Sequence, residues 1–341
     1  MQELKYKILK LLQTSDNIFD LLSQLNEYIG TVEQALSELK EQGLIAVSEG
    51  KIHARGGFTG GLDQDSRPET ANPTMYSEPA CPPQESDVAR LLMHEYLELT
   101  KDRPRPITEY DQGYVTPESV MARVSILDSR GDLDDSRVFV LGDDDLTSLA
   151  LALTGKPREI VVAEIDPRLV EFINSSGQKM KSLAGHAISP VLAVPYDVRH
   201  PLPSDLARKF SVCVTDPLET KSGFPLFLRR AAEALSDAGS TLLFALTDLE
   251  CPPKRWHEFQ IALLRTGFVL KDLLKDCQRY VLPDNDFVFR EYPGLRDFKP
   301  KSPYKGSWYH ASLVRAIAIR QPDPSWIVTE GESDIYMDRE S

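Results

Sequence analysis

The sequence predicts an α/β protein with a mostly parallel sheet and helices on both of its faces, preceded by a small helical domain. Beyond residue 136, short apolar runs alternate with helical segments, the pattern of parallel strands joined by crossover helices. Residues 1–55 instead carry three helical periods and a hairpin pattern, and a stretch rich in Gly, Pro and Ser separates the two parts. We therefore expect two domains in this chain of 341 residues.

The composition limits the classes of function. Hydrophobic residues make up 41% of the chain, and no run of about 18 apolar residues or secretory signal pattern is present, so we expect a cytoplasmic protein without membrane contact. The four cysteines include no C-x-x-C pair, so we expect no metal site. The net charge of −13 repels nucleic acid and attracts cationic small molecules, although solubility alone is an alternative explanation for it.

The first domain, residues 1–55, has a winged-helix pattern. Three helices are expected before Gly43, and strands at 44–47 and 51–54 complete the motif. The third helix, in the place of a DNA recognition helix, carries three glutamates against one lysine. Because that surface repels phosphates, we expect packing or dimerisation, with a homodimer, rather than nucleic-acid binding.

Residues 56–86 are expected to be a linker, residues 87–321 the catalytic domain and residues 322–341 an acidic tail. Thr116 followed by Pro117 has the pattern of a helix N-cap. The expected strands, all short apolar runs, are 138–141, 160–165, 191–194, 210–214, 241–245 and 269–273. The expected helices between and before them are 87–101, 117–128, 145–154, 167–182, 224–238 and 253–266.

The first of these strands leads into a loop with three consecutive carboxylates. Ligands of such sheets bind at the carboxyl ends of the strands, and Gly142 allows the backbone to turn tightly beneath a nucleoside. Asp143, Asp144 and Asp145 follow, where a dinucleotide-binding loop would have more glycines. Carboxylates repel an anionic tail but attract an amine, from which one of them can take a proton. One aspartate, with Asp145 as the candidate, is alternatively a helix cap.

Acidic residues also end the next three strands. Glu164 suits hydrogen bonds to ribose hydroxyls, and Asp166, followed by proline, is expected to cap the next helix. Asp197 suits an adenine amino group, with a solvated loop carboxylate as the alternative. Asp216 and Glu219 flank a rigid turn that is similar to the D-P-P-[YF] turn of amino-group methyltransferases, but Glu219 replaces the aromatic residue. A flexible cationic amine therefore fits this turn better than a nucleobase, unless it is a plain structural turn.

Taken together, six segments resemble the branched-chain polyamine synthase family, the N4-bis(aminopropyl)spermidine synthases. These segments are EYDQGYVTPES at 109–119, FVLGDDDLTSLALALTG at 139–155, AEIDPRL at 163–169, YDVRHPLP at 196–203, TDPLET at 215–220 and SWYHASLVR at 307–315. The resemblance implies a Rossmann-like, methyltransferase-type domain after a winged helix. Two positions depart from the family pattern: Leu218 replaces the second proline of D-P-P-E-T, and His310 replaces a lysine.

The resemblance also implies the reaction and its residues. Decarboxylated S-adenosylmethionine, as co-substrate rather than tightly bound cofactor, gives its aminopropyl group to an amine of spermidine, N4, and leaves methylthioadenosine. The implied reaction centre consists of Asp143, Asp144 and Asp145. The donor is held by Gln112, Glu164 and Asp197, in addition to Gly142. The polyamine is positioned by Tyr110, Asp111, Asp216 and Glu219.

Two alternatives remain from the residues themselves. A methyltransferase that uses S-adenosylmethionine on an amine or on adenine fits the sheet pattern and the D-P-x-E turn, but the missing glycines argue against it. A winged-helix regulator with a ligand-sensing domain is the other alternative, and its acidic third helix speaks against DNA binding.

Overall fold

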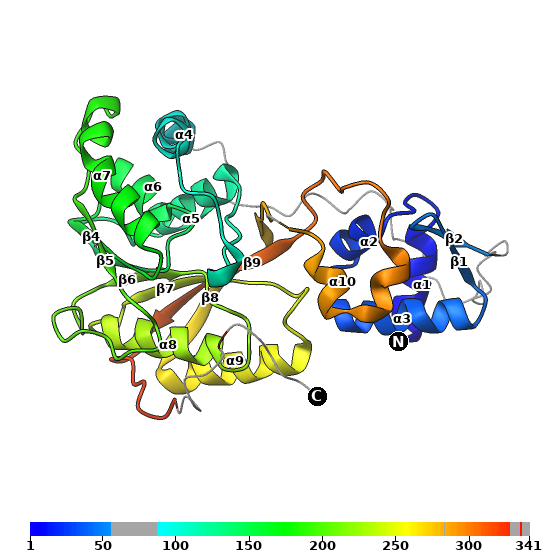
Figure 1. The fold of residues 1–341 in the computed structure, drawn as a ribbon. Coiled ribbons are helices and arrows are strands. Elements are labelled where there is room, and N and C mark those ends of the chain that lie inside the picture. Colours follow the sequence, from blue (N-terminus) through cyan, green and yellow to red (C-terminus); the bar gives the residue numbers. More distant parts are fainter. Residues whose placement is uncertain (56–86, 283, 328–334, 336–341) are drawn as a thin grey trace, which may run out of the picture.

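The computed structural model describes residues 1–55, 87–282, 284–327 and 335 of the chain. Figure 1 shows two lobes, a small one with the N-terminal helices and a large one built on a sheet. Within the described residues, no helix has the length and apolar character needed to cross a bilayer.

The small lobe contains three helices and an antiparallel hairpin, in the order that the sequence predicts. The helices are α1 (Gln2–Leu11), α2 (Ile18–Leu25) and α3 (Ile29–Glu41), and the strands are β1 (Ile45–Ser48) and β2 (Lys51–Ala54). Asn17 caps α2, because its side chain accepts a hydrogen bond from the backbone N–H of Phe19 at 2.9 Å. The apolar faces of all three helices are buried in one core.

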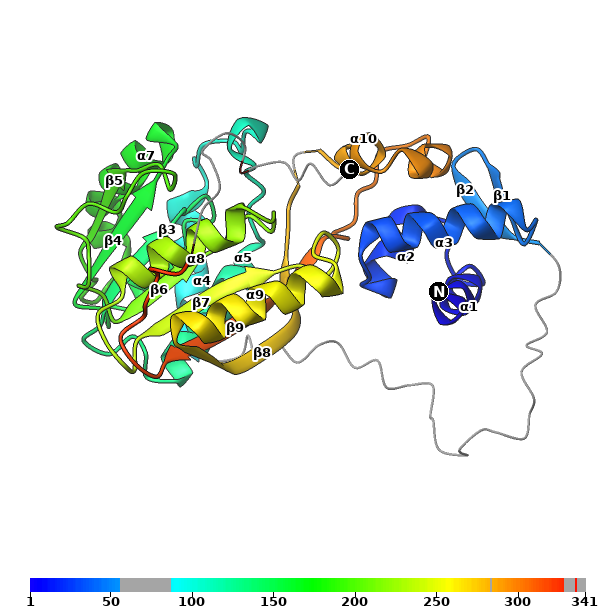
Figure 2. The same cartoon turned by 90° about the horizontal axis from the view of Figure 1, so that it is seen from below.

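A segment from the far end of the chain completes this small lobe. Helix α10 (Phe287–Glu291) and the 3-10 helix η3 (Pro293–Phe298) lie against the N-terminal helices in both views (Figures 1 and 2). Phe19 contacts the rings of Phe289 and Trp308, with centroids 5.7 Å and 5.1 Å away. Residues 287–309 therefore share a core with residues 1–55, although the sequence assigns them to the catalytic domain.

The large lobe is built on a seven-stranded sheet with the order β5-β4-β3-β6-β7-β9-β8. The strands are β3 (Arg137–Leu141), β4 (Glu159–Glu164), β5 (Val191–Pro195), β6 (Val212–Thr215), β7 (Thr241–Leu246), β8 (Phe268–Arg279) and β9 (His310–Ala318). Pairing is parallel from β5 to β7 and antiparallel on both sides of β9. The strand order reverses at β3, so the switch point lies between β3 and β6.

Helices cover both faces of this sheet. One face carries α4 (Asp87–Thr100), α5 (Pro117–Ser129), α6 (Thr147–Leu153) and α7 (Pro167–Leu183), and the 3-10 helix η2 (Thr108–Tyr110) precedes α5. The opposite face carries α8 (Gly223–Ala234) and α9 (Pro253–Thr266), where Phe224 and Phe259 stack with centroids 4.0 Å apart. Figure 1 shows these two layers above and below the strands. The predicted Rossmann-like fold is thus confirmed.

Strand β9 is absent from the predicted strands, and β8 is longer than predicted. Arg315 stands in the middle of β9 and interrupts its apolar run, yet it is only 7% exposed. The structure explains this burial, because Arg315 donates hydrogen bonds to Asp132 at 2.6 and 2.7 Å and to Asp272 at 3.1 Å. The sequence pattern alone does not reveal an ion pair that neutralises a charge inside a sheet.

Candidate active site

A cleft with about 680 Å³ of empty space, part of it open to solvent, lies at the carboxyl ends of β3, β4, β5 and β6. Its polar lining residues are Tyr110, Asp111, Gln112, Asp143, Asp144, Glu164, Tyr196 and Asp216. Its other lining residues are Leu141, Gly142, Ala163, Ile165, Val198, Leu218, Phe227 and Ile335. The cleft thus combines several carboxyl groups with an apolar wall, at the edge of the sheet where the sequence analysis expects a site.

The loop after β3 separates the three aspartates by its backbone conformation. Gly142 and Leu146 both have positive φ, +73° and +57°, which is uncommon for a leucine. Asp143 is buried, and its carboxylate accepts hydrogen bonds from the backbone N–H of Ser148 at 3.3 Å, at the start of α6. Leu146 occupies the N-cap position of α6, so no aspartate caps this helix as expected of Asp145, and Asp143 is the one whose carboxylate bonds to its first turn.

Asp144 is the half-buried aspartate of this loop, and it lines the cleft. Among the described residues, its carboxylate has no hydrogen-bond or ion-pair partner. Burial raises its pKa well above the ordinary value, and the negative charges of Asp145 and Asp216 raise it further. Its carboxyl group is therefore poised to hold or exchange a proton.

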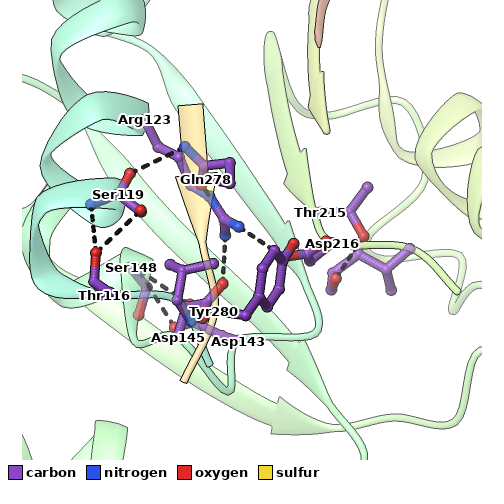
Figure 3. Close-up of polar contacts among 12 residues, drawn as sticks. Thr116, Ser119, Arg123, Asp143, Asp145, Ser148, Thr215, Asp216, Gln278 and Tyr280 are labelled. Carbon is purple, nitrogen blue, oxygen red and sulfur yellow. Dashed lines mark hydrogen bonds and ion pairs between the residues drawn. The ribbon is translucent and has the colours of Figure 1, made fainter. Parts of the chain in front are cut away.

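Asp145 is held by Arg123, a buried residue of α5. One carboxylate oxygen of Asp145 accepts from the N–H of Val115 at 2.6 Å, and the other accepts from Arg123 at 2.5 Å. Arg123 also donates to Asp216 at 2.6 Å, and the hydroxyl of Tyr280 donates to the same oxygen of Asp216 at 2.7 Å. Figure 3 shows Arg123 reaching both aspartates with Tyr280 beside them. Both oxygens of Asp145 are thus engaged within the protein.

Glu164, at the end of β4, organises the other side of the cleft. Its two carboxylate oxygens accept from the backbone N–H groups of Asp143 at 2.7 Å and Asp166 at 2.8 Å. Each oxygen keeps a lone pair for a further donor. Asp166 caps α7 through the N–H of Arg168 at 2.9 Å, as predicted, and accepts from the side chain of Gln112 at 3.0 Å.

Three predicted site residues are not among the lining residues of the cleft: Asp145, described above, and Asp197 and Glu219. Asp197 forms an ion pair with Arg199, and this hydrogen-bonded partner lowers the pKa of Asp197. Glu219 accepts from the N–H of Thr247 at 3.0 Å, and burial raises its pKa well above the ordinary value. Their neighbours in sequence, Tyr196, Val198 and Leu218, line the cleft instead.

Arg123, Gln278 and Tyr280 contact the site but are not among the residues predicted from the sequence. Arg123 stands in the segment VMARVSIL, whose other positions are mostly apolar. An arginine on the buried face of a helix needs a carboxylate partner, so this pattern indicates a buried ion pair. Tyr280 follows β8 directly and carries no comparable signal in the sequence.

Residues 91–341 match the family model described as the branched-chain polyamine synthase A C-terminal domain. The chain belongs to the branched-chain polyamine synthase family. It is 36% identical over 232 residues to the N(4)-bis(aminopropyl)spermidine synthase of Thermococcus kodakarensis, covering 68% of this chain and 64% of that one. It is 37% identical over 238 residues to the enzyme of that name from Thermus thermophilus, covering 70% and 66%. These two matches span slightly less than two thirds of the relatives' own length.

A solved member of the family has the same overall fold. The crystal structure of the branched-chain polyamine synthase from Thermus thermophilus, in complex with N4-aminopropylspermidine and 5'-methylthioadenosine, aligns with a TM-score of 0.81 at 30% identity. The alignment covers 98% of this chain and 92% of that chain. The resemblance expected from the sequence is thus confirmed at the level of the family.

The buried acids of this family member predict that its stability falls as the pH rises. Burial raises the pKa of Asp143 to about 8 and that of Asp111 to about 7. Between about pH 4 and pH 8 the unfolded chain releases these protons while the native chain keeps them, so the free energy of unfolding decreases with pH. We expect Asp143→Asn to flatten the dependence of the melting temperature on pH in this range. Asp134→Asn, at an exposed site, is the control, and an equally steep slope in both variants would contradict the prediction.

Proposed function

We propose that the chain transfers the aminopropyl group of decarboxylated S-adenosylmethionine to an amine of spermidine, N4, with release of methylthioadenosine. The observation that carries the proposal is the carboxylate of Asp144, which lines the cleft beside Asp216 without a described protein partner of its own. Family membership supports it, and so does the Thermus thermophilus structure, whose two ligands are what this reaction would leave in the site.

The reaction is a displacement at carbon. The lone pair of the acceptor nitrogen forms a bond to the aminopropyl carbon next to the sulfonium, the C–S bond breaks, and its electron pair leaves the sulfur as a neutral thioether. A free aliphatic amine has a pKa of roughly 10, so the attacking nitrogen must first lose a proton. We assign that proton to the carboxylate of Asp144, which becomes a neutral acid. The reaction thereby removes the positive charge of the donor sulfonium and the negative charge of the Asp144 carboxylate.

The remaining predicted residues divide between the two substrates. We assign the nucleoside to Gly142, Glu164 and Gln112, because a glutamate that keeps one lone pair on each oxygen suits vicinal hydroxyls. The polyamine is assigned to Tyr110, Asp111 and Asp216 in the lining of the cleft. Asp197 and Glu219 lie beside the cleft, and we assign Asp197 to the adenine and Glu219 to the amine. Asp145 supports the site through its ion pair with Arg123.

Substitution of Glu164 by glutamine is expected to weaken binding of methylthioadenosine. A hydrogen bond to a charged acceptor contributes about 1.5–3 kcal/mol, which corresponds to a Kd increase of roughly 10- to 100-fold. The amide group would also face the N–H of either Asp143 or Asp166 with a donor. Calorimetric titration measures the effect. Glu159→Gln, at the opposite end of β4, is the matched control, and equal affinities in both variants would remove Glu164 from the nucleoside site.

Donor choice tests the function itself. Spermidine is incubated with the enzyme and either decarboxylated S-adenosylmethionine or S-adenosylmethionine, and the products are identified by mass spectrometry. We expect aminopropylated spermidine from the decarboxylated donor alone, because the tail carboxylate of the other donor meets the acidic loop. Methylated spermidine from S-adenosylmethionine would instead establish a methyltransferase.

We also propose that the protein is a cytoplasmic homodimer that does not bind nucleic acid. The acidic α3, with three glutamates, supports the last point. Light scattering on the purified full chain measures the oligomeric state, and a monomeric mass at working concentration would refute the dimer.

A further inference from the structure

We infer that Arg123 is a positioning residue that gives the carboxylates of the site different functions. It binds Asp145 and one oxygen of Asp216, and it leaves the carboxylate of Asp144 for the acceptor amine. This inference rests on the proposed function. It concerns a residue that does not line the cleft, so its effect on the reaction passes through the carboxylates that it holds.

The guanidinium bridges elements that the sheet brings together. Arg123 is 3% exposed, and its three nitrogens donate to three different residues (Figure 3). Asp145 follows β3, Asp216 follows β6, and Gln278 belongs to β8. Since β3 and β6 are the strands that flank the switch point, Arg123 fixes the two loops between which the ligand would bind.

Gln278 fixes the orientation of this guanidinium. Its side-chain oxygen accepts from Nε of Arg123 at 2.6 Å, and its amide nitrogen donates to the backbone oxygens of Ser119 at 3.3 Å and Cys277 at 3.1 Å. The side chain of Gln278 is fully buried. A planar fork with three directed donors satisfies this arrangement, whereas the compact ammonium of a lysine cannot reach all three acceptors.

The same contacts determine which oxygens remain for a substrate. Oδ2 of Asp216 accepts from both Arg123 and Tyr280, so Oδ1 is the oxygen of this cleft-lining residue that is left for an ammonium group. Both oxygens of Asp145 are engaged by Arg123 and Val115. Asp144 is thus the member of the loop that lines the cleft and whose carboxylate the described protein leaves open.

The charge of Arg123 also limits the rise of the pKa of Asp216, which on balance lies above its ordinary value. Burial raises the pKa of Asp216, while Arg123 and the hydrogen bond from Tyr280 lower it. The other charged or titratable groups that act on the Asp144–Asp216 pair are Arg103, Asp111, Asp145, Glu164 and Glu219. All of these except Arg103 are acidic. A weakened contact with Arg123 therefore raises the pKa of Asp216, and its carboxyl group then ionises at a higher pH.

The experiment compares Arg123→Lys with the wild-type full chain. We expect kcat to fall by roughly 100-fold, as for a misplacement of about 1 Å, and the acidic limb of the pH profile of kcat/KM to move to higher pH. The Kd of methylthioadenosine should stay within about twofold, because Arg123 does not touch Glu164 or Gln112. Arg130→Lys is the matched control, since Arg130 follows the same helix and pairs with Asp272 outside the site.

A second variant, Tyr280→Phe, allows the same test if Arg123→Lys does not fold. Tyr280→Phe keeps Arg123 and removes one donor from Oδ2 of Asp216, so it should shift the pH profile in the same direction by a smaller amount. Unchanged pH profiles in Arg123→Lys and Tyr280→Phe, with loss of stability alone, would overturn the positioning role. Absence of aminopropyl transfer in the wild-type protein would instead refute the proposed function, which separates the two failures.

Discussion

Replacement of Asp144 by asparagine is expected to lower the rate of aminopropyl transfer by roughly 10²- to 10⁴-fold, the usual contribution of a positioned general base. The amide keeps the size of the side chain but takes no proton from the acceptor amine. The fold should be unaffected, because the carboxylate of Asp144 has no protein partner within the described residues.

Steady-state turnover with spermidine and the decarboxylated donor measures this effect, with circular dichroism as the check on folding. Asp134→Asn, an exposed aspartate outside the cleft, is the control and should turn over like the wild type. A variant of Asp144 that retains more than about a tenth of the activity would assign the proton to another group, and a large loss in folded Asp143→Asn would point to Asp143.

The second large effect is expected on stability. Asp145→Leu should lower the free energy of unfolding by about 3–5 kcal/mol, the usual cost of removing one partner from a buried ion pair. Arg123 would keep only Asp216 as a charged partner, and the N–H of Val115 would lose its acceptor at 2.6 Å. Urea unfolding of the purified chain, followed by fluorescence, gives the measurement.

A double variant distinguishes the ion pair from simple loss of packing. Arg123→Met combined with Asp145→Leu removes both charges, so we expect it to be more stable than Asp145→Leu alone. Destabilisation that is additive in the double variant would mean that the two residues do not act as a pair. This pair of side chains is nearly inaccessible to solvent, at 3% exposure each, so screening by salt should change the result little.

The sequence was sufficient to predict where the site lies, because the carboxyl ends of parallel strands meet at one edge whatever the loops contain. Gly142, Glu164 and Asp216 could be placed there from strand patterns alone. The order of three helices and a hairpin could be predicted because apolar spacing in residues 1–55 is regular.

The functions of the three adjacent aspartates could not be separated from the sequence. They are chemically identical, and it is the turn between Gly142 and Leu146, both with positive φ, that brings Asp143 to the start of α6 and Asp145 to Arg123. The partners of Arg123 were equally hidden, because Asp216 and Gln278 are 93 and 155 positions away along the chain. Such pairs follow from the strand order, which the apolar pattern does not specify.

The path of the chain between β8 and β9 links the small lobe to the candidate site. Tyr280 leaves β8 at the site, the chain then crosses to the N-terminal helices, and it returns at His310, whose Nε2 donates to the backbone oxygen of Ser23 at 2.9 Å. Removal of residues 1–55 would therefore expose Phe289 and Trp308 to water and remove the hydrogen-bond partner of His310, while the pairing of Arg279 with His310 in the sheet would remain. The small lobe thus packs against the middle of the β8–β9 connection, whose first residue, Tyr280, donates to Asp216 in the lining of the cleft.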